Sequence, residues 1–264
     1  MKRLLVVGLL SVSVWAQKVD VPGNADVVAA RTANKELRFA DAETLMLKDT
    51  ALNPQSSLMW IELGSAEMGL KKYDAAEVAF KKALGIDPET QKALHQDDFF
   101  ATDIPATRAT RNTAAHTTYS NEKLNPEIVG KAYSDLGEIY ARTKRTAEGQ
   151  AAWDSAVKAN PAKAPLYLGN ETIVFYQLGN SDAQEAAAEK AIAVDPTRAM
   201  LYYFKGQALV SKATMDPKSQ HLVPPPGCVE AYQKYLSLEP KGQFSDEARQ
   251  MLAAVGQPVK AGGK

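Results

Sequence analysis

The residues of this sequence that could do chemistry include three histidines and a group of acidic side chains. His95 lies just before Asp97 and Asp98, and imidazole and carboxylate groups are ligands that a divalent cation accepts. A solvated acidic turn is the alternative interpretation of the same residues. His116 and His221 lie far away in the sequence, and no pair of histidines has the spacing of a helical zinc motif. We therefore predict no metal site.

Other catalytic patterns are missing from the sequence. It contains neither a GxSxG nucleophile turn nor a glycine-rich phosphate loop, and Gly64, Gly137 and Gly206 lie inside apolar helical patterns, where they suit close helix packing. Carboxylates are numerous, but they fall on the expected solvent faces of helices. We predict that the protein is not an enzyme and uses no cofactor.

Cys228 is the only cysteine of the chain, which excludes an internal disulfide. It follows Pro224, Pro225, Pro226 and Gly227 and opens an amphipathic pattern. One interpretation is a reactive thiol on a proline-rich loop, and the other is a small apolar residue in the core. The repeat described next favours the core, because it gives Cys228 the same place in its helix as Ala76.

The elements that would position these residues recur along the chain. Pro54 and Pro88 are 34 residues apart, and Pro161 and Pro196 are 35 apart, a period typical of stacked structural repeats. The clearest copy is WIELGSAEMGLKKYDAAEVAFKKALGIDP, residues 60–88, in which apolar residues recur at helical spacing in two segments. Its marker residues are Trp60, Leu63, Gly64, Tyr73, Ala76, Phe80, Ala83 and Pro88. Asp74 with Glu77 resembles a capping box that would start the second helix.

These eight residues resemble the signature of the tetratricopeptide repeat. The resemblance implies an all-α fold, a right-handed superhelical solenoid of antiparallel helix pairs. A second copy has Tyr133, Leu136, Gly137 and Trp153 in the corresponding positions, and a third ends at Pro196. The third has Glu171 and Thr172 where the family has Leu and Gly, so we expect its first helix to pack less tightly. The prolines and the capping helix near the C-terminus also resemble those of secreted bacterial repeat proteins.

The repeats divide the chain as follows. We predict two N-terminal units over residues 23–88, the first degenerate, and three C-terminal units over 128–240. Between them, 89–127 is expected to be a partly disordered insertion. A second insertion lies at about 212–226, between the helices of the last unit. Residues 241–256 are expected to form a capping helix with a polar outer face, and 257–264 a flexible tail.

The N-terminus has the features of an export signal. Lys2 and Arg3 precede the apolar run LLVVGLLSVSV, and residues 1–16 end on Ala16, which fits a cleaved signal peptide. The run is too short to span a bilayer as a helix, so we expect no membrane insertion after cleavage; an uncleaved anchor is the alternative. We expect an exported protein of the bacterial periplasm or the extracellular space.

The charge balance argues against a nucleic-acid partner. The chain has 31 basic and 31 acidic residues, and loss of Lys2 and Arg3 would leave a slight acidic excess. Such a balance provides no basic footprint for nucleic acid or an anionic membrane.

The resemblance implies that a concave face, lined by the first helix of each unit, binds an extended peptide or a protein. The candidate partner-binding residues on that face are Glu62, Lys131, Asp135, Glu138, Asn170, Tyr176, Tyr203, Phe204 and Gln207. Family members that clamp a terminal carboxylate have Lys, Asn and Arg in several of these positions, whereas Glu62, Asp135 and Glu138 are acidic. We expect a face that is acidic at one end, where it would favour a basic segment, and aromatic at the other.

Tyr176, Tyr203 and Phe204 are the expected anchors for apolar side chains of a partner. The alternative is that this aromatic cluster packs under the 212–226 insertion. The sequence thus predicts a protein-binding scaffold in a cell-envelope complex, or a structural subunit that associates with itself as a homo-oligomer.

Overall fold

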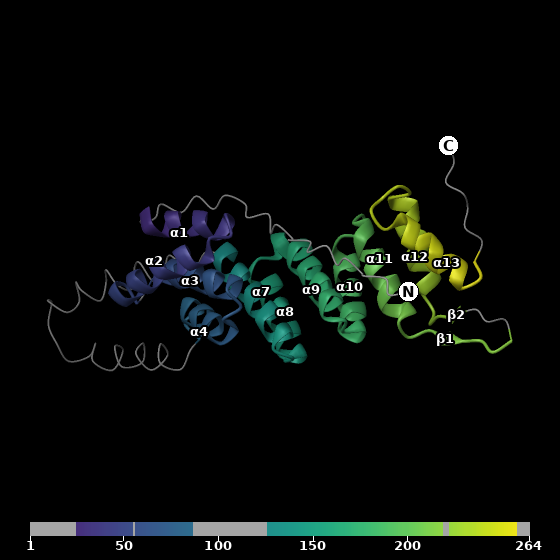
Figure 1. Cartoon of the computed structure of the whole chain (residues 1–264), viewed down its shortest axis with the longest axis horizontal. Helices are drawn as coiled ribbons and strands as arrows, with labels where there is room; N and C mark the ends of the chain where they lie inside the picture. The colour runs from purple at the N-terminus through teal and green to yellow at the C-terminus, as the bar shows by residue number, and fades with distance from the viewer. Residues whose placement is uncertain (1–24, 55, 87–125, 219–221, 258–264) are drawn as a thin grey trace, which may run out of the picture.

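The computed structural model describes residues 25–54, 56–86, 126–218 and 222–257 (Figure 1). The predicted signal peptide, most of the 89–127 insertion and most of the 257–264 tail lie outside these residues. The described part is almost entirely helical. Its α-helices are α1 (Ala25–Lys35), α2 (Phe39–Leu52), α3 (Ser57–Gly69), α4 (Tyr73–Leu84), α7 (Pro126–Arg142), α8 (Thr146–Ala159), α9 (Ala164–Leu178), α10 (Ser181–Val194), α11 (Ala199–Val210), α12 (Cys228–Leu238) and α13 (Ser245–Ala254).

The helices form consecutive pairs that stack along the long axis of the molecule (Figure 1). We call α1, α3, α7, α9 and α11 the first helices and α2, α4, α8, α10 and α12 the second helices. Each first helix packs against the second helix of its own pair and also against the next first helix in the series. The predicted all-α solenoid of helix pairs is confirmed.

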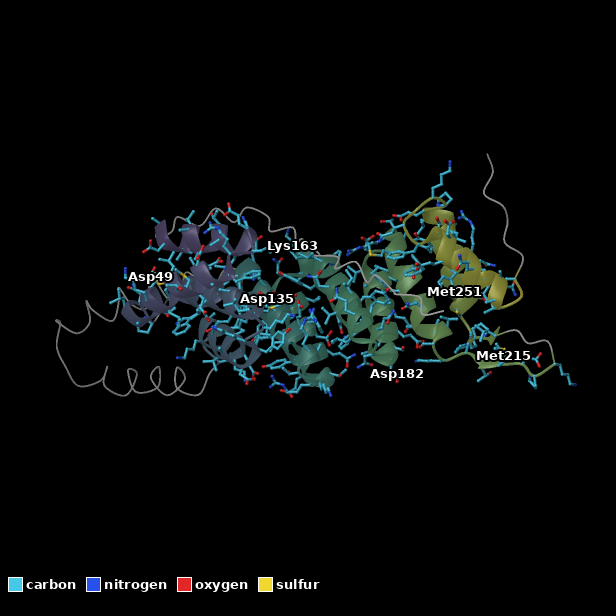
Figure 2. All side chains as sticks on the ribbon, viewed as in Figure 1. Asp49, Asp135, Lys163, Asp182, Met215 and Met251 are labelled. Atoms are coloured by element: carbon cyan, nitrogen blue, oxygen red, sulfur yellow. The ribbon has the colours of Figure 1, made fainter. Side chains whose placement is uncertain are left out.

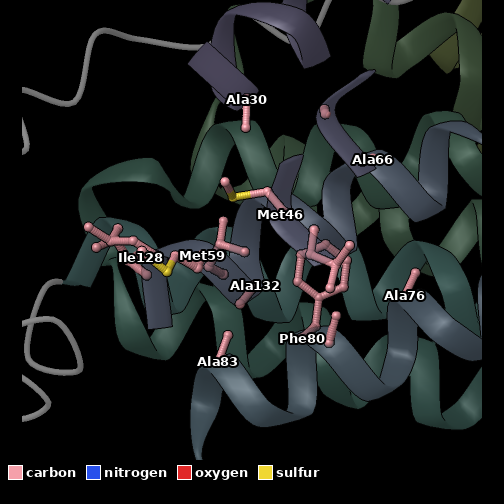
Figure 3. Close-up of a cluster of buried hydrophobic side chains, with 14 of the residues drawn as sticks. Ala30, Met46, Met59, Ala66, Ala76, Phe80, Ala83, Ile128 and Ala132 are labelled. Carbon is pink, nitrogen blue, oxygen red and sulfur yellow. The ribbon is translucent and has the colours of Figure 1, made fainter. Parts of the chain in front are cut away.

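The stack continues across the undescribed residues 87–125. Helix α7 packs directly against α3 and α4, and Ile128 and Ala132 of α7 belong to the same buried cluster as Met59 and Phe80 (Figure 3). An ion pair between Arg145 at the start of α8 and Glu77 of α4 joins the two second helices. The described units before and after this gap therefore share one hydrophobic core.

A close approach between a small residue and an aromatic ring holds three of the pairs together. A Cβ atom built on Gly64 would lie 3.0 Å from the Phe80 ring, one on Gly137 2.7 Å from the Trp153 ring, and one on Gly206 3.0 Å from the Tyr232 ring. These distances are too short for any larger residue without a shift of the ring. Glycine on the first helix thus makes room for an aromatic residue on the second.

The α9–α10 pair reverses this arrangement of sizes. Thr172 occupies the position of Gly64 and Gly137, and Ala188 the position of Phe80 and Trp153. Both are completely buried. A larger residue on the first helix is matched by a smaller one on the second, so the departure from the repeat pattern at Thr172 leaves a filled interface rather than the looser one expected.

The turns inside the pairs explain where the second helices begin. One residue has a left-handed conformation in each of the first four turns: Leu37, Lys71, Lys144 and Gly179, with φ between 61° and 67°. The second helix starts two residues later in each case, so Lys72 is the N-cap of α4 and makes no side-chain cap. The predicted capping box at Asp74 and Glu77 is therefore wrong.

The C-terminal unit contains the predicted insertion as a short hairpin. Strands β1 (Thr214–Met215) and β2 (Leu222–Val223) pair antiparallel, and Figure 1 shows them projecting beyond α12. Gly227, with φ of 89°, turns the chain into α12. Helix α13 then packs on α12 at the end of the stack.

Candidate protein-binding face

The predicted partner-binding residues lie on the consecutive first helices α3, α7, α9 and α11, and we call the surface on which they lie the first-helix face. It follows from the stacking, because α1, α3, α7, α9 and α11 contact one another in this order. Residues three and four apart lie on the same side of a helix, so each first helix contributes several neighbouring side chains. Figure 2 shows Asp135 of this face near the middle of the stack.

At the N-terminal end, Glu62 is engaged by α1. The Arg31 Nε atom lies 2.7 Å from a Glu62 carboxylate oxygen. The Asn34 side-chain amide donates to the Glu62 carbonyl at 3.0 Å and to the carboxylate at 3.2 Å. Glu62 is only 4% exposed. The prediction that Glu62 contacts a partner is wrong for this conformation, because α1 already covers and satisfies its carboxylate.

In the middle of the face, α3 and α7 meet through Lys131. Its ammonium donates to Ser65 Oγ at 3.0 Å and forms an ion pair with Asp135 one turn along α7. One turn further, Arg142 pairs with Glu138 at 2.7 Å and donates to the Gln177 side-chain oxygen of α9 at 3.0 Å. These contacts link α3, α7 and α9 across the surface.

The end of the face that we expected to be acidic carries no excess of negative charge. Glu62, Asp135 and Glu138 each have a basic partner, Arg31, Lys131 and Arg142 respectively. A basic segment would have to compete with these internal cations for each carboxylate. The prediction that Asp135 and Glu138 favour a basic partner segment therefore loses its basis.

The aromatic end is largely covered by the C-terminal segment. Tyr203 and Phe204 are each 3% exposed. The Phe244 ring stacks on the Tyr203 ring with centroids 4.1 Å apart and planes within 8°, and the Tyr203 hydroxyl donates to Glu247 of α13 at 2.5 Å. Burial and this carboxylate raise the pKa of Tyr203. Tyr203 and Phe204 are thus core residues, and their prediction as partner anchors is wrong.

The alternative interpretation is correct that the aromatic cluster is buried. The segment that packs on it is the capping segment, whereas the 212–226 insertion was expected. Phe244, Ala248 and Leu252, from the capping segment, belong to the cluster around Tyr203. The signal available in the sequence was Phe244 just before an amphipathic helix, but the pattern did not show which side of α11 that helix would cover.

Tyr176, Asn170 and Gln207 lie half-buried on the same face. The Tyr176 ring packs against Phe204 with centroids 4.7 Å apart, which holds the ring in place. The Gln207 side-chain oxygen lies 3.5 Å from the Gln184 amide nitrogen. These three residues and Gln177, which is exposed, form the accessible C-terminal part of the first-helix face.

Cys228 is buried, as predicted. It is 1% exposed, and its thiol points at the Gly206 carbonyl oxygen, 3.5 Å away. Burial is the main cause that raises the pKa of the thiol to about 11, with Glu230 adding to it. A thiol that stays protonated at neutral pH is a poor nucleophile.

We expect Cys228 to resist thiol reagents in the folded protein, because a reagent cannot reach the buried sulfur and little of the thiol is in the reactive thiolate form. A disulfide reagent that releases a coloured thiol should report almost no labelling under native conditions at pH 8 and one labelled group in denaturant. Full labelling of the native protein within minutes would contradict the buried position.

Glu171 is the residue of this region whose chemistry the repeat pattern did not anticipate. It is completely buried, and neither carboxylate oxygen has a hydrogen-bond partner among the residues that the structure describes. Burial raises its pKa to about 7, Asp154 raises it further and Lys190 opposes the shift. Its place where the family has Leu was the only signal in the sequence.

The described ranges contain neither a metal-binding cluster nor a helix that could span a membrane. These ranges leave out His95, Asp97, Asp98, His116 and His221, and within them no three His, Cys, Asp or Glu side chains gather where they could hold a metal ion. None of the helices in the same part of the chain combines the length and apolar character needed to cross a membrane.

Solved structures that match this chain have low sequence identity to it. YrrB, titled a TPR protein with an unusual peptide-binding site, is 13% identical; the match covers 85% of this chain and 90% of that one, with a TM-score of 0.49. The TPR2AB domain of yeast Sti1, solved in a complex with pHSP90, is 15% identical. The match covers 88% of this chain and 98% of that one, with a TM-score of 0.36. PilF of Pseudomonas aeruginosa is 13% identical over 84% and 94%, with a TM-score of 0.32.

No curated protein matches the chain. A family model of the tetratricopeptide repeat does match, at residues 58–90. These residues include α3 and α4, the pair with the clearest signature. This match identifies α3 and α4 as a tetratricopeptide repeat, and the other helix pairs stack on either side of it.

Proposed function

We propose that this protein is an exported scaffold that holds a peptide or protein partner on its first-helix face, within a complex of the bacterial cell envelope. The observation that carries the proposal is the continuity of that face. Side chains of α3, α7 and α9 contact one another across helix boundaries, so the surface is held in place before any partner arrives. A preorganised surface loses less conformational entropy on binding than a mobile one.

The export and envelope parts of the proposal are supported by the N-terminal sequence. Lys2 and Arg3, the apolar run after them and the small residue Ala16 are features of a signal peptide. Detection of the chain in the envelope fraction, with its N-terminus at Gln17, would support export. Detection only in the cytoplasm with Met1 retained would refute it.

The binding surface is tested by substituting Tyr176, with a matched control. Tyr202 is also a half-buried tyrosine, but it lies beside Ile192 of α10 and Ala231 of α12, against second helices. We expect Tyr176→Ser to weaken capture of the partner from the envelope fraction by at least about tenfold, since aromatic residues dominate interface energies. Tyr202→Ser should leave capture unchanged.

Equal capture by both variants would move the binding site away from the first-helix face. Both proteins should first be compared with the parent by circular dichroism and thermal unfolding, so that a folding defect is not taken for lost binding.

Self-association is the second candidate, and one observation favours it. Helices α1 and α2 and the turn between them expose large apolar residues, with Leu52 70%, Leu37 65%, Leu47 52% and Val28 50% exposed. Exposed apolar residues at the end of a stack suit contact with another subunit. A molar mass that rises with concentration in light scattering, and returns to the monomer value in Leu47→Lys, would support this candidate.

A further inference from the structure

The C-terminal part of the first-helix face carries no accessible charge within its helices. Helix α9 contains one acidic residue and no basic one, and that residue, Glu171, is completely buried. Helix α11 contains one charged residue, Lys205, which pairs with Glu189 of α10 at 2.8 Å and so faces the second helices. The two helices themselves therefore add no accessible charge to this surface. Arg198, the half-buried N-cap of α11, borders it: the guanidinium lies against Gly169 and donates to the Pro165 carbonyl oxygen at 3.3 Å.

The charges of the N-terminal part are already paired with one another. Arg31 pairs with Glu62, Lys131 with Asp135 and Arg142 with Glu138. A charged partner would gain little by replacing such a pair, because it would exchange one ion pair for another. The N-terminal part of the face therefore offers a partner few unpaired charges.

The uncharged part offers groups that suit a peptide backbone. Asn170 is half-buried, and no hydrogen bond joins its amide to another of the described residues. Gln177 uses its oxygen to accept from Arg142 and so keeps its amide hydrogens for a partner. A side-chain amide both donates and accepts, as the N–H and C=O groups of an extended peptide require.

Apolar contact is available beside these amides. Ile173 and Tyr176 are partly buried and pack against the cluster around Tyr203, while Tyr176 rests on Phe204. One side of each therefore remains open to a partner side chain. The combination is an amide-lined track beside an aromatic and an aliphatic surface.

We propose that Asn170, Ile173, Tyr176, Gln177 and Gln207 bind an extended, uncharged segment of the partner protein, with amides meeting its backbone and one of its apolar side chains packing on Tyr176. This inference rests on the proposed function and defines the partner that the first-helix face accepts. It replaces the basic segment expected from the sequence.

The test uses the full chain and a displayed library of random peptides as the probe. Peptides selected against the parent should be poor in Asp, Glu, Lys and Arg and contain an aliphatic or aromatic residue. Their affinity should change by less than about twofold between about 0.05 and 0.5 M salt, because screening affects only charge interactions. Each selected peptide is then measured against a pair of variants of opposite charge.

Asn170→Asp and Asn170→Lys form that pair. For an uncharged partner, both should weaken binding by about tenfold or more, because each buries a charge without a counterion against the peptide. An acidic partner segment would instead bind Asn170→Lys more tightly, and a basic one would bind Asn170→Asp more tightly. Either sign-dependent gain, or selected peptides rich in one charge, would overturn the inference.

The same experiment separates failure of the inference from failure of the proposed function. Charged peptides that lose affinity for Tyr176→Ser but not for Tyr202→Ser would overturn the inference and keep the first-helix face as the binding site. Selected peptides that bind Tyr176→Ser as well as the parent would overturn both, as would a library from which no binder emerges.

Discussion

Replacement of Glu171 by Gln is expected to stabilise the protein by about 3 kcal/mol at pH 8. The Glu171 carboxyl group has a pKa of about 7 in the folded protein against an ordinary value of 4.5, and each pKa unit corresponds to about 1.4 kcal/mol. Both carboxylate oxygens are buried, and no described residue forms a hydrogen bond with them, so the folded state disfavours the ionised form. Gln keeps the shape and removes the charge.

The direction of the pH dependence follows from the raised pKa. Below pH 4.5 Glu171 is protonated in both states and ionisation costs nothing. As the pH rises from 4.5 to about 7, the unfolded chain loses the proton while the folded protein retains it, so the free energy of unfolding falls. Above about pH 7 Glu171 is ionised in both states, and the reduction in the free energy of unfolding no longer changes with pH. Glu171→Gln should therefore be most stabilising at pH 8 and least so at pH 4.

Urea titrations of the parent and variant across this pH range measure the difference directly. Comparison with the parent is needed because burial also raises the pKa of Glu67 to about 7, which adds its own pH dependence to both proteins. The exposed Glu230→Gln is the matched control and should change stability little at any pH. A difference between Glu171→Gln and the parent that does not change with pH would contradict the buried, unpaired carboxylate.

Glu171→Leu should stabilise the protein as well. Leu63 and Leu136 occupy the corresponding positions of α3 and α7 and are almost completely buried, which shows that the site suits a leucine in other pairs. If Glu171→Leu raises the free energy of unfolding and Glu171→Gln does not, then apolar packing rather than the charge limits stability at this position.

Trp153→Ala is expected to cost about 3–5 kcal/mol in the free energy of unfolding. Trp153 is completely buried on α8, faces Gly137 of α7 and packs edge-to-face on Phe175 of α9 with ring centroids 5.5 Å apart. Truncation would leave a cavity between three helices. Because total stability is small, thermal unfolding of this variant should begin well below that of the parent.

Trp153→Phe is the control that distinguishes loss of volume from loss of a specific group. Phe80 occupies the same place in α4 opposite Gly64, and the Trp153 indole N–H forms no hydrogen bond with any part of the chain that the structure describes. The cost should be about 1 kcal/mol, because one ring still fills the space. Similar costs for Ala and Phe would mean that the indole has a role that its packing does not reveal.

Much of the fold was predictable because repeated local patterns specify it. The spacing of Gly64 and Phe80, and again of Gly137 and Trp153, predicts helices that approach closely at the same point of each pair. The burial of Cys228 followed in the same way from its alignment with Ala76. Such inferences succeed because the side of a helix that packs on its own pair is determined by residues close in sequence.

The candidate site was predicted less completely. Asn170, Tyr176 and Gln207 lie on the first-helix face and remain accessible, whereas Glu62, Tyr203 and Phe204 are covered. The cover of Glu62 comes from Arg31 and Asn34 in α1, a helix that keeps little of the repeat signature, and the cover of Tyr203 comes from Phe244. Nothing in the pattern around Glu62 or Tyr203 indicates these distant contacts.

The sequence by itself determined the helix pairs, their order and the core residues inside each pair, because the hydrophobic period is local. Only the tertiary structure decided which first-helix residues stay open to a partner. That outcome depends on ion pairs between Arg31 and Glu62 and between Arg142 and Glu138, and on where the capping segment settles. A side chain on the accessible side of its own helix becomes buried when packing against another segment lowers the free energy more than contact with water does. The packing contacts that decide this are made between residues far apart in the chain.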